Sequence, residues 1–255
     1  MTVLAANRLA IGYGDKTVAS GLSLACAAGT VTCLIGPNGV GKTTLFKTLL
    51  GLLPPLGGNV TVGDAGLATL SRQDIARRIA YVPQAHTTEF AYTVIDLVVM
   101  GRTAYLGAFG GPRPIDYDKA MAALGTLGIA DLAAREITRI SGGQRQLAFI
   151  ARALAQESRI IFMDEPTASL DLGNRVRVLR TVRALAREGL AIVLSTHEPE
   201  HAFEIADHVA VLGHGNRFVT GEVKAVLTAE ALSGLYGVPL RVERTPSGRH
   251  VVGPA

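Results

Sequence analysis

Short, uninterrupted apolar runs recur along the chain. They cover residues 31–35, 79–82, 160–163, 191–194 and 209–212. A strand that is covered on both faces of a sheet has no exposed side for polar residues, so runs of this length predict buried parallel strands. Apolar residues at helical spacing lie between several of the runs. This alternation predicts an α/β fold, with a layered core around a mostly parallel sheet.

Two of the intervening helices can be recognised by their apolar faces. The first face consists of Leu45, Phe46, Leu49, Leu50 and Leu53, and the second of Val176, Leu179, Val182 and Leu185. Proline cannot continue a helix, so Pro54-Pro55 predicts where the first helix ends.

The pattern changes between residues 92 and 158. This stretch is alanine-rich with helical spacing, and a turn-rich loop, GAFGGPRP, interrupts it at residues 107–114. We therefore expect a helical subdomain at residues 85–157, inserted into the α/β core of a single domain that spans residues 1–255. A C-terminal extension at residues 222–255 carries one short helix candidate, residues 229–235, followed by strand-like residues.

Composition narrows the functional classes. The net charge is +4, but the basic residues are scattered singly, so no basic tail suggests a nucleic-acid partner. Cys26 and Cys33 lie in or beside apolar runs, which predicts buried thiols rather than a disulfide or a metal pair. The first residues lack the features of a secretory signal, and the long apolar stretch at residues 49–56 is too short to span a membrane. We expect a cytosolic protein that reaches any membrane through a partner.

A phosphate-binding loop follows the first strand and precedes the first helix. Residues 36–43 read GPNGVGKT and match the pattern G-x-x-x-x-G-K-S/T in the strand–loop–helix setting that this motif requires. Glycines let the backbone wrap around phosphates, and the helix N-terminus adds N–H groups and its dipole. Lys42 can bridge the β- and γ-phosphates, and the Thr43 hydroxyl can bind Mg²⁺. The predicted nucleotide contacts are Gly36, Pro37, Asn38, Gly39, Gly41, Lys42, Thr43 and Thr44.

Polar residues follow three other strands, at the edge of the sheet where open α/β folds bind ligands. Asp164 is the expected Mg²⁺ partner, and Glu165 is the group expected to orient and deprotonate the attacking water. Gln84 carries an amide that can bind the metal or that water. A lone histidine at a strand end is more often structural, but His197 shares this edge with Lys42 and can contact the γ-phosphate.

A second anion site is indicated by residues 140–147, ISGGQRQL. Ser141 is a good N-cap, and the helix predicted after it has one apolar face, formed by Leu147, Ile150, Ala151 and Leu154. The free N–H groups and the positive dipole end of this helix favour an anion.

Taken in order, these motifs resemble those of the ATP-binding cassette (ABC) ATPases, over residues 3–221. The matches are Tyr13 for the aromatic residue that stacks on adenine, Gln84 for the Q-loop, Ser141, Gly142, Gly143 and Gln144 for the signature, Asp164 and Glu165 for the acidic pair, Asp171 for the D-loop and His197 for the switch histidine. The signature begins with Ile140 where leucine is commonest, which is a conservative change.

The resemblance implies a P-loop NTPase core with a small antiparallel β part and a helical insert. It also implies that two cassettes pack head to tail, so that Ser141, Gly142 and Gly143 close over the γ-phosphate held by Lys42 of the other copy. ATP then forms part of the interface, and its hydrolysis, with Mg²⁺ as cofactor, drives a conformational cycle. We expect both sites of such a homodimer to be active.

ABC ATPases drive several different processes. The interval between the phosphate loop and the signature is too short, and too poor in heptads, for the coiled-coil insert of DNA-repair ABC ATPases. A soluble cassette of iron–sulfur assembly stays the alternative. Residues 93–107, TVIDLVVMGRTAYLG, resemble the segment after the Q-loop in importers of metal chelates (iron siderophores, haem, cobalamin or molybdate), and residues 226–239 fit the same group. An amphipathic helix explains the apolar spacing there, but not the Met-Gly-Arg-x-x-x-Leu-Gly ending.

The resemblance therefore implies the ATP-binding subunit of a metal-chelate importer. Such a subunit is peripheral, at the cytoplasmic face of the inner membrane. Its partners are a second copy of itself, an integral permease dimer and, indirectly, a periplasmic or extracellular substrate-binding protein. The chelate itself touches those partners and cannot be named from this chain.

Overall fold

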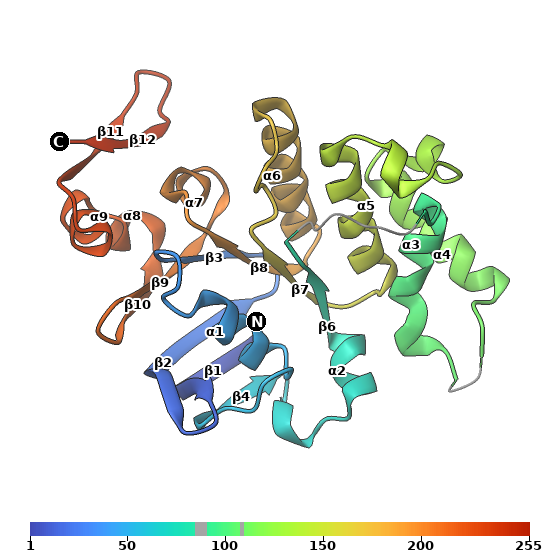
Figure 1. Ribbon diagram of the computed structural model, residues 1–255, viewed down its shortest axis with the longest axis horizontal. Coiled ribbons are helices and arrows are strands. Elements are labelled where there is room, and N and C mark those ends of the chain that lie inside the picture. The colour runs from blue at the N-terminus through green and yellow to red at the C-terminus, as the bar shows by residue number, and fades with distance from the viewer. Residues whose placement is uncertain (85–90, 108–109) are drawn as a thin grey trace.

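The computed structural model describes residues 1–84, 91–107 and 110–255 (Figure 1). Its centre is a six-stranded sheet with the order β10-β9-β3-β8-β7-β6. The strands are β3 (Val31–Ile35), β6 (Ile79–Val82), β7 (Ile160–Asp164), β8 (Ala191–Thr196), β9 (His208–Gly213) and β10 (Arg217–Glu222). All pairings in this sheet are parallel except that of β9 with β10. The α/β prediction with a mostly parallel sheet is confirmed, and each of the five apolar runs forms one strand.

A second, antiparallel sheet packs beside the first. It has the order β2-β1-β4-β5 and consists of β1 (Thr2–Tyr13), β2 (Lys16–Ala27), β4 (Gly57–Val62) and β5 (Ala65–Gly66). Helix α1 (Lys42–Leu49) lies between the two sheets, and one buried apolar cluster joins all three elements. Phe46 of α1 meets Phe162 of β7 edge to face, with ring centroids 5.1 Å apart. The phosphate loop is thereby anchored between two rigid layers.

The end of α1 corrects one prediction. The helix stops at Leu49, whereas Pro54-Pro55 had indicated an end near Leu53. Gly51 adopts a left-handed φ of 70°, its N–H bonds to Thr48 O at 3.1 Å, and the next N–H bonds to Lys47 O at 2.9 Å. This pattern closes the last turn of a helix around a glycine. The prolines only follow it.

Helices α5 (Gly142–Ala155), α6 (Leu172–Arg187) and α7 (Pro199–Ile205) cover the other face of the main sheet. Helices α3 (Val94–Val99) and α4 (Pro114–Thr126) pack on α5, whereas α2 (Arg72–Arg78) lies on the α1 side of the sheet, where Ile75 packs against the same apolar cluster. Short 3-10 turns lie at Leu67–Thr69, Met100–Tyr105, Ala130–Leu132 and Ile137–Arg139. Helices α3, α4 and α5 gather at one end of the molecule, on the right in Figure 1. The expected subdomain began at residue 85 and its loop at residue 107; residues 85–90 and 108–109 of these predictions lie outside the described part of the chain.

The C-terminal extension forms α8 (Val223–Val226), α9 (Ala229–Tyr236) and a hairpin of β11 (Leu240–Arg244) and β12 (His250–Pro254). The helix predicted at residues 229–235 is confirmed as α9. The hairpin packs against α7. Within the ranges that the structure describes, no helix is both long enough and apolar enough to cross a membrane.

Candidate nucleotide site

The phosphate loop requires glycine at three of its positions. A Cβ on Gly36 would lie 2.3 Å from Leu212 O, and one on Gly41 would lie 2.7 Å from Val18 Cγ1. Gly39 and Gly41 have φ values of 78° and 113°, in the region that only glycine enters freely. The loop can therefore pass close to β9 and still turn into α1.

Lys42 lies at the centre of this loop. Its Nζ donates hydrogen bonds to Gly36 O at 2.6 Å and to Pro37 O at 3.0 Å. Burial lowers the pKa of the Lys42 ammonium, and the nearby carboxylates of Glu165 and Asp164 counteract this shift. The Lys42 ammonium is thus held inside the loop by the loop's own carbonyl groups.

A polar cavity of about 400 Å³ opens beside the lysine. Its lining consists of Asn38, Gly39, Gly41, Lys42, Thr43, Thr44, Gln84, Asp164 and Glu165. These predicted site residues come from three separate places in the sequence, and the carboxyl ends of β3, β6 and β7 bring them together. A cavity with a buried cation, backbone N–H groups and carboxylates is suited to a phosphate chain and a divalent cation.

Two residues that the sequence analysis missed hold Asp164. Ser195 Oγ donates to Asp164 Oδ1 at 2.6 Å, and the Tyr81 hydroxyl donates to Oδ2 at 3.4 Å. Ser195 Oγ also accepts the backbone N–H of Glu165 at 3.0 Å. Burial, together with the charge of Asp164, raises the pKa of Tyr81 to about 12, so the phenol stays protonated. The one sequence signal for Ser195 was its place near the end of an apolar strand next to β7.

Glu165 and His197 are in contact. His197 Nδ1 lies 3.3 Å from Glu165 Oε2, and the histidine is about half exposed. Glu165 has a left-handed φ of 44°, a costly conformation for a residue with a side chain. The bend after Asp164 turns the Glu165 carboxylate toward both the cavity and His197. A carboxylate beside an imidazole can accept a proton from water in the cavity.

The donors around the cavity also fit Mg²⁺. Thr43 offers a hydroxyl oxygen, Gln84 an amide oxygen and Asp164 a carboxylate, and all three residues line the same cavity. Magnesium prefers oxygen ligands and needs only one or two from the protein when phosphates supply the rest. Bound there, it would neutralise phosphate charge.

The signature residues lie elsewhere in the fold. Ser141 caps α5: its Oγ accepts the Gln144 N–H at 3.2 Å, while Gln144 Oε1 accepts the Ser141 N–H at 3.0 Å. Gly142 and Gly143 form the first turn of the helix. None of these four residues is among those that line the cavity around Lys42.

Asp171 and Tyr13 are also separate from that cavity. Asp171 caps α6, accepting the Asn174 N–H at 2.8 Å and the Asn174 side-chain amide at 2.7 Å. A Cβ on Gly143 would lie 2.1 Å from Asn174 Oδ1, so the signature helix and the Asp171 turn pack directly against each other. Tyr13 ends β1 with half of its surface exposed.

The sequence model of the ABC transporter family matches residues 19–168. An uncharacterized ABC transporter ATP-binding protein of Haemophilus influenzae is 43% identical over 92% of this chain and 89% of its own length. The hemin import ATP-binding protein HmuV of Thermobifida fusca is 39% identical over 96% of this chain and 85% of its own length. A structure described as an inward-facing metal-chelate type ABC transporter is 34% identical with a TM-score of 0.88, covering 99% of this chain and 96% of that one.

Proposed function

The chain belongs to the ABC transporter family as an ATP-binding subunit, an ATPase, and we propose that it powers the import of a metal chelate through a separate membrane permease. The single observation that carries the ATPase chemistry is the cavity in which Lys42, Thr43 and Asp164 meet. Import of a chelate is supported by two relatives: the Thermobifida fusca protein is named for hemin import, and the Escherichia coli ferric enterobactin transport ATP-binding protein FepC is 36% identical over 92% of this chain.

When ATP binds, Lys42 exchanges its hydrogen-bond partners. Lys42 leaves the carbonyls of Gly36 and Pro37 and bridges the β- and γ-phosphates, while the loop N–H groups surround the phosphate oxygens. Tyr13 stacks on the adenine ring. Thr43, Gln84 and Asp164 would hold Mg²⁺, which would neutralise the charge of the transferred phosphoryl group.

Hydrolysis uses Glu165 and His197. Glu165 accepts a proton from water as the water oxygen bonds to the γ-phosphorus, and the bond from that phosphorus to the oxygen bridging it to the β-phosphate breaks. His197 donates a hydrogen bond to the γ-phosphate and helps to place the Glu165 carboxylate, which it already contacts at 3.3 Å. Ser195 holds the Asp164 carboxylate in place for metal binding and the Glu165 backbone in place for proton transfer.

The site is completed by a second copy of the chain. The first turn of α5 has free N–H groups and the positive end of a helix dipole, which favour a phosphate. Ser141, Gly142, Gly143 and Gln144 do not line the cavity of their own chain. As the resemblance to ABC ATPases implies, they serve the γ-phosphate of the partner copy. Asp171, packed beside Gly143 through Asn174, lies at the same interface. ATP binding closes this homodimer and hydrolysis reopens it.

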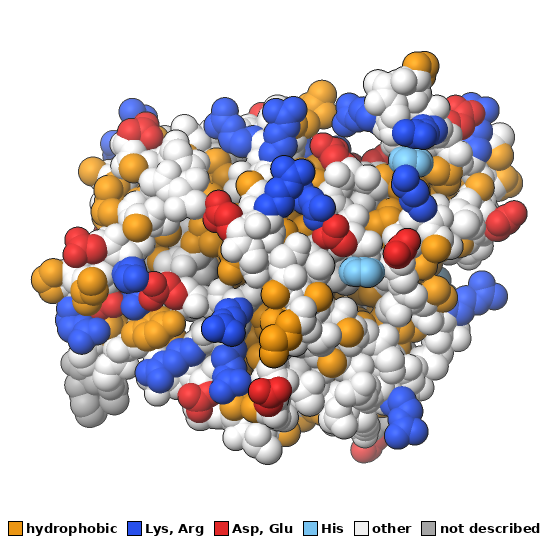
Figure 2. Space-filling model, turned by 180° about the vertical axis from the view of Figure 1, so that it is seen from behind, with side chains coloured by type: hydrophobic (Ala, Val, Ile, Leu, Met, Phe, Trp, Pro, Cys, Tyr) orange, Lys and Arg blue, Asp and Glu red, His pale blue; other side chains and the backbone are white. Residues whose placement is uncertain are grey.

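The permease contacts the end of the molecule that carries the helical subdomain, residues 85–157. Met100, Ile115, Tyr117 and Met121 are exposed large apolar residues at this end. Figure 2 shows hydrophobic side chains on the side of the molecule that carries these helices. Gln84 lies where the core meets this end, so closure over ATP shifts the permease-facing surface. The subunit is then peripheral, at the cytoplasmic face of the cell membrane.

Replacement of the proposed base tests the chemistry. Glu165→Gln should bind ATP, hydrolyse it at least about a hundredfold more slowly, and accumulate as a closed dimer in size-exclusion chromatography with ATP and Mg²⁺. Glu188→Gln is the control, because it removes an exposed carboxylate at the end of α6 that does not line the cavity. Near-normal turnover in Glu165→Gln would exclude Glu165 as the base.

A second variant tests the shared site. A Cβ on Gly142 has room, since its nearest contact would be Leu170 Cδ2 at 3.7 Å. Gly142→Asp should therefore fold and retain ATP binding by the monomer, but the new carboxylate should repel the partner's γ-phosphate and abolish dimer closure and hydrolysis. Normal hydrolysis by this variant would contradict the shared site.

The transport role is tested through the partner. Co-expression with the permease encoded nearest to it should give a complex whose ATPase rate in proteoliposomes rises with one metal chelate and its binding protein. Recovery only with soluble scaffold proteins would favour iron–sulfur assembly instead.

A further inference from the structure

The loop that carries His197 is held from outside the nucleotide site. The hydroxyl of Tyr236, at the end of α9, donates a hydrogen bond to the backbone carbonyl of His197 at 3.0 Å. The ring of Tyr236 packs against the buried apolar core formed by the main sheet and helices α5, α6 and α7, and this packing fixes the position of the ring. Burial raises the pKa of Tyr236 to about 12, so the hydroxyl remains a donor throughout the physiological range.

The C-terminal hairpin, β11–β12, contacts α7, the helix that follows this loop. Glu200 of α7 accepts the Val252 N–H at 3.1 Å, and the ring of Phe203 stacks on His250 with centroids 4.6 Å apart. These contacts start three residues after His197. The C-terminal extension therefore touches the chain both at His197 and immediately beyond it.

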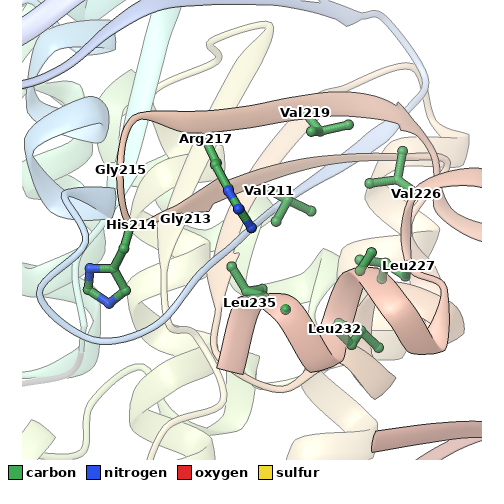
Figure 3. Close-up of a pocket in the computed structure, with 12 residues that line it drawn as sticks. Val211, Gly213, His214, Gly215, Arg217, Val219, Val226, Leu227, Leu232 and Leu235 are labelled. Atoms are coloured by element: carbon green, nitrogen blue, oxygen red, sulfur yellow. The ribbon is translucent and has the colours of Figure 1, made fainter. Parts of the chain in front are cut away.

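The opposite side of α9 borders a cavity. A cavity of about 620 Å³ lies among α8, α9 and the β9–β10 hairpin, and Leu232 and Leu235 of α9 line it (Figure 3). Val211 of β9 and Val219 of β10 face the same space. Leu232 is nevertheless fully buried in the apolar core, so α9 is anchored beside this cavity as well as at His197.

We propose that Tyr236 is a positioning residue for His197, through which the C-terminal extension sets the rate of ATP hydrolysis. The inference rests on the role proposed for His197. The peptide after His197 is held by two hydrogen bonds, from the Tyr236 hydroxyl to the His197 carbonyl and from the Glu198 N–H to Thr196 Oγ1 at 3.1 Å. The backbone fixed in this way carries the imidazole that contacts Glu165 Oε2. A shift of α9 therefore moves the imidazole relative to Glu165 and the γ-phosphate.

Tyr236→Phe is the test, because it removes the hydroxyl and keeps the ring in the core. Tyr105→Phe is a matched control: the Tyr105 hydroxyl also donates to a backbone carbonyl, that of Gln156, at 3.0 Å, but at the helical end of the molecule. The loss of one hydrogen bond corresponds to about a two- to tenfold change in an equilibrium or rate. We expect kcat to fall by about that factor in Tyr236→Phe with KM for ATP unchanged, and neither to change in Tyr105→Phe.

A second measurement reports the imidazole directly. Of the six histidines, His197 can be assigned in a histidine-labelled NMR spectrum by its disappearance in His197→Gln. Its ring signals should shift in Tyr236→Phe and stay in place in Tyr105→Phe, a difference that a general loss of stability does not produce. Unmoved His197 signals in Tyr236→Phe would overturn the positioning role. Full hydrolysis by His197→Gln would instead overturn the role of His197 itself, so the two failures can be told apart.

Discussion

Ser195 and Asp164 are direct neighbours across β7 and β8, and the serine hydroxyl donates a 2.6 Å hydrogen bond to the carboxylate. The same hydroxyl accepts the N–H of Glu165, whose backbone is in the strained left-handed region. One fully buried side chain thus holds the proposed metal ligand and the proposed base together. It does so without lining the cavity itself.

Ser195→Ala should therefore impair hydrolysis more than binding. The substitution leaves the Glu165 N–H without an acceptor, which costs about 1–3 kcal/mol of unfolding free energy, and it releases the Glu165 bend. We expect kcat to fall by about tenfold or more with a smaller change in nucleotide affinity. Ser158→Ala is the control, because Ser158 is also buried and bonds Ile160 O, at the opposite end of β7. Equal losses of kcat in the two variants would contradict the role of Ser195.

Gly143 and Gly142 should respond differently to a methyl group. At Gly143 the added Cβ would meet the Asn174 side chain at 2.1 Å and push it away from Asp171. Gly143→Ala should therefore lower the free energy of unfolding by about 1–3 kcal/mol, whereas Gly142→Ala has room and should be near neutral. Urea unfolding measures both. A Gly143→Ala variant as stable as Gly142→Ala would show that this contact is not tight.

The contacts of Arg102 account for the arginine of the Met-Gly-Arg ending, which helical spacing does not explain. Its buried guanidinium donates to Asp116 Oδ1 at 3.1 Å, to Ala155 O at 2.8 Å and to Glu157 Oε2 at 2.7 Å. The planar guanidinium also lies 4.0 Å over the Tyr105 ring. It thereby ties the turn after α3 to α4 and to the end of α5.

Arg102→Lys should loosen the helical end of the molecule, because an ammonium group cannot make this planar set of bonds. We expect a lower thermal midpoint and faster proteolysis within residues 94–155, with ATP binding preserved. Arg113→Lys is the control, since Arg113 pairs with the same Asp116 but is 65% exposed. The prediction fails if both variants melt at the same temperature as the unaltered protein.

Alkaline pH should destabilise the fold through the two cysteines. Burial raises the pKa of Cys26 to about 12 and raises that of Cys33 as well, whereas a thiol in an unfolded chain titrates near 8.5. Above about pH 9 the unfolded chain loses protons that the folded chain keeps, so the free energy of unfolding falls, by up to about 1.4 kcal/mol per pH unit for each thiol. Urea midpoints from pH 7 to 10 would measure this slope.

The cysteine-free variant, Cys26→Ala with Cys33→Ala, should show a flatter dependence up to pH 10. Tyr81 and Tyr236, whose pKa values are raised to about 12, add their own loss only above that range. An unchanged slope in the cysteine-free variant would assign the alkaline loss to other groups.

The sequence predicted the central sheet well because its strands are buried on both faces, as in β3 and β8, where every residue is buried. The outer sheet was not located, since β1 and β2 mix exposed and buried positions and their pairing has several register shifts. The phosphate loop and the acidic pair follow motifs with fixed spacing. No motif identifies Ser195 or Tyr236, because the role of a single hydroxyl depends on the atoms that the fold places beside it.

The order of the strands has a consequence for unfinished chains. Strand β8 lies between β3 and β7, although it follows both in the sequence. A polypeptide that stops before residue 191 already carries Lys42, Asp164 and Glu165, yet it lacks the strand that spaces them. We therefore expect nascent or truncated copies to consume no ATP. With this strand order, only a chain that includes β8 can assemble the complete site.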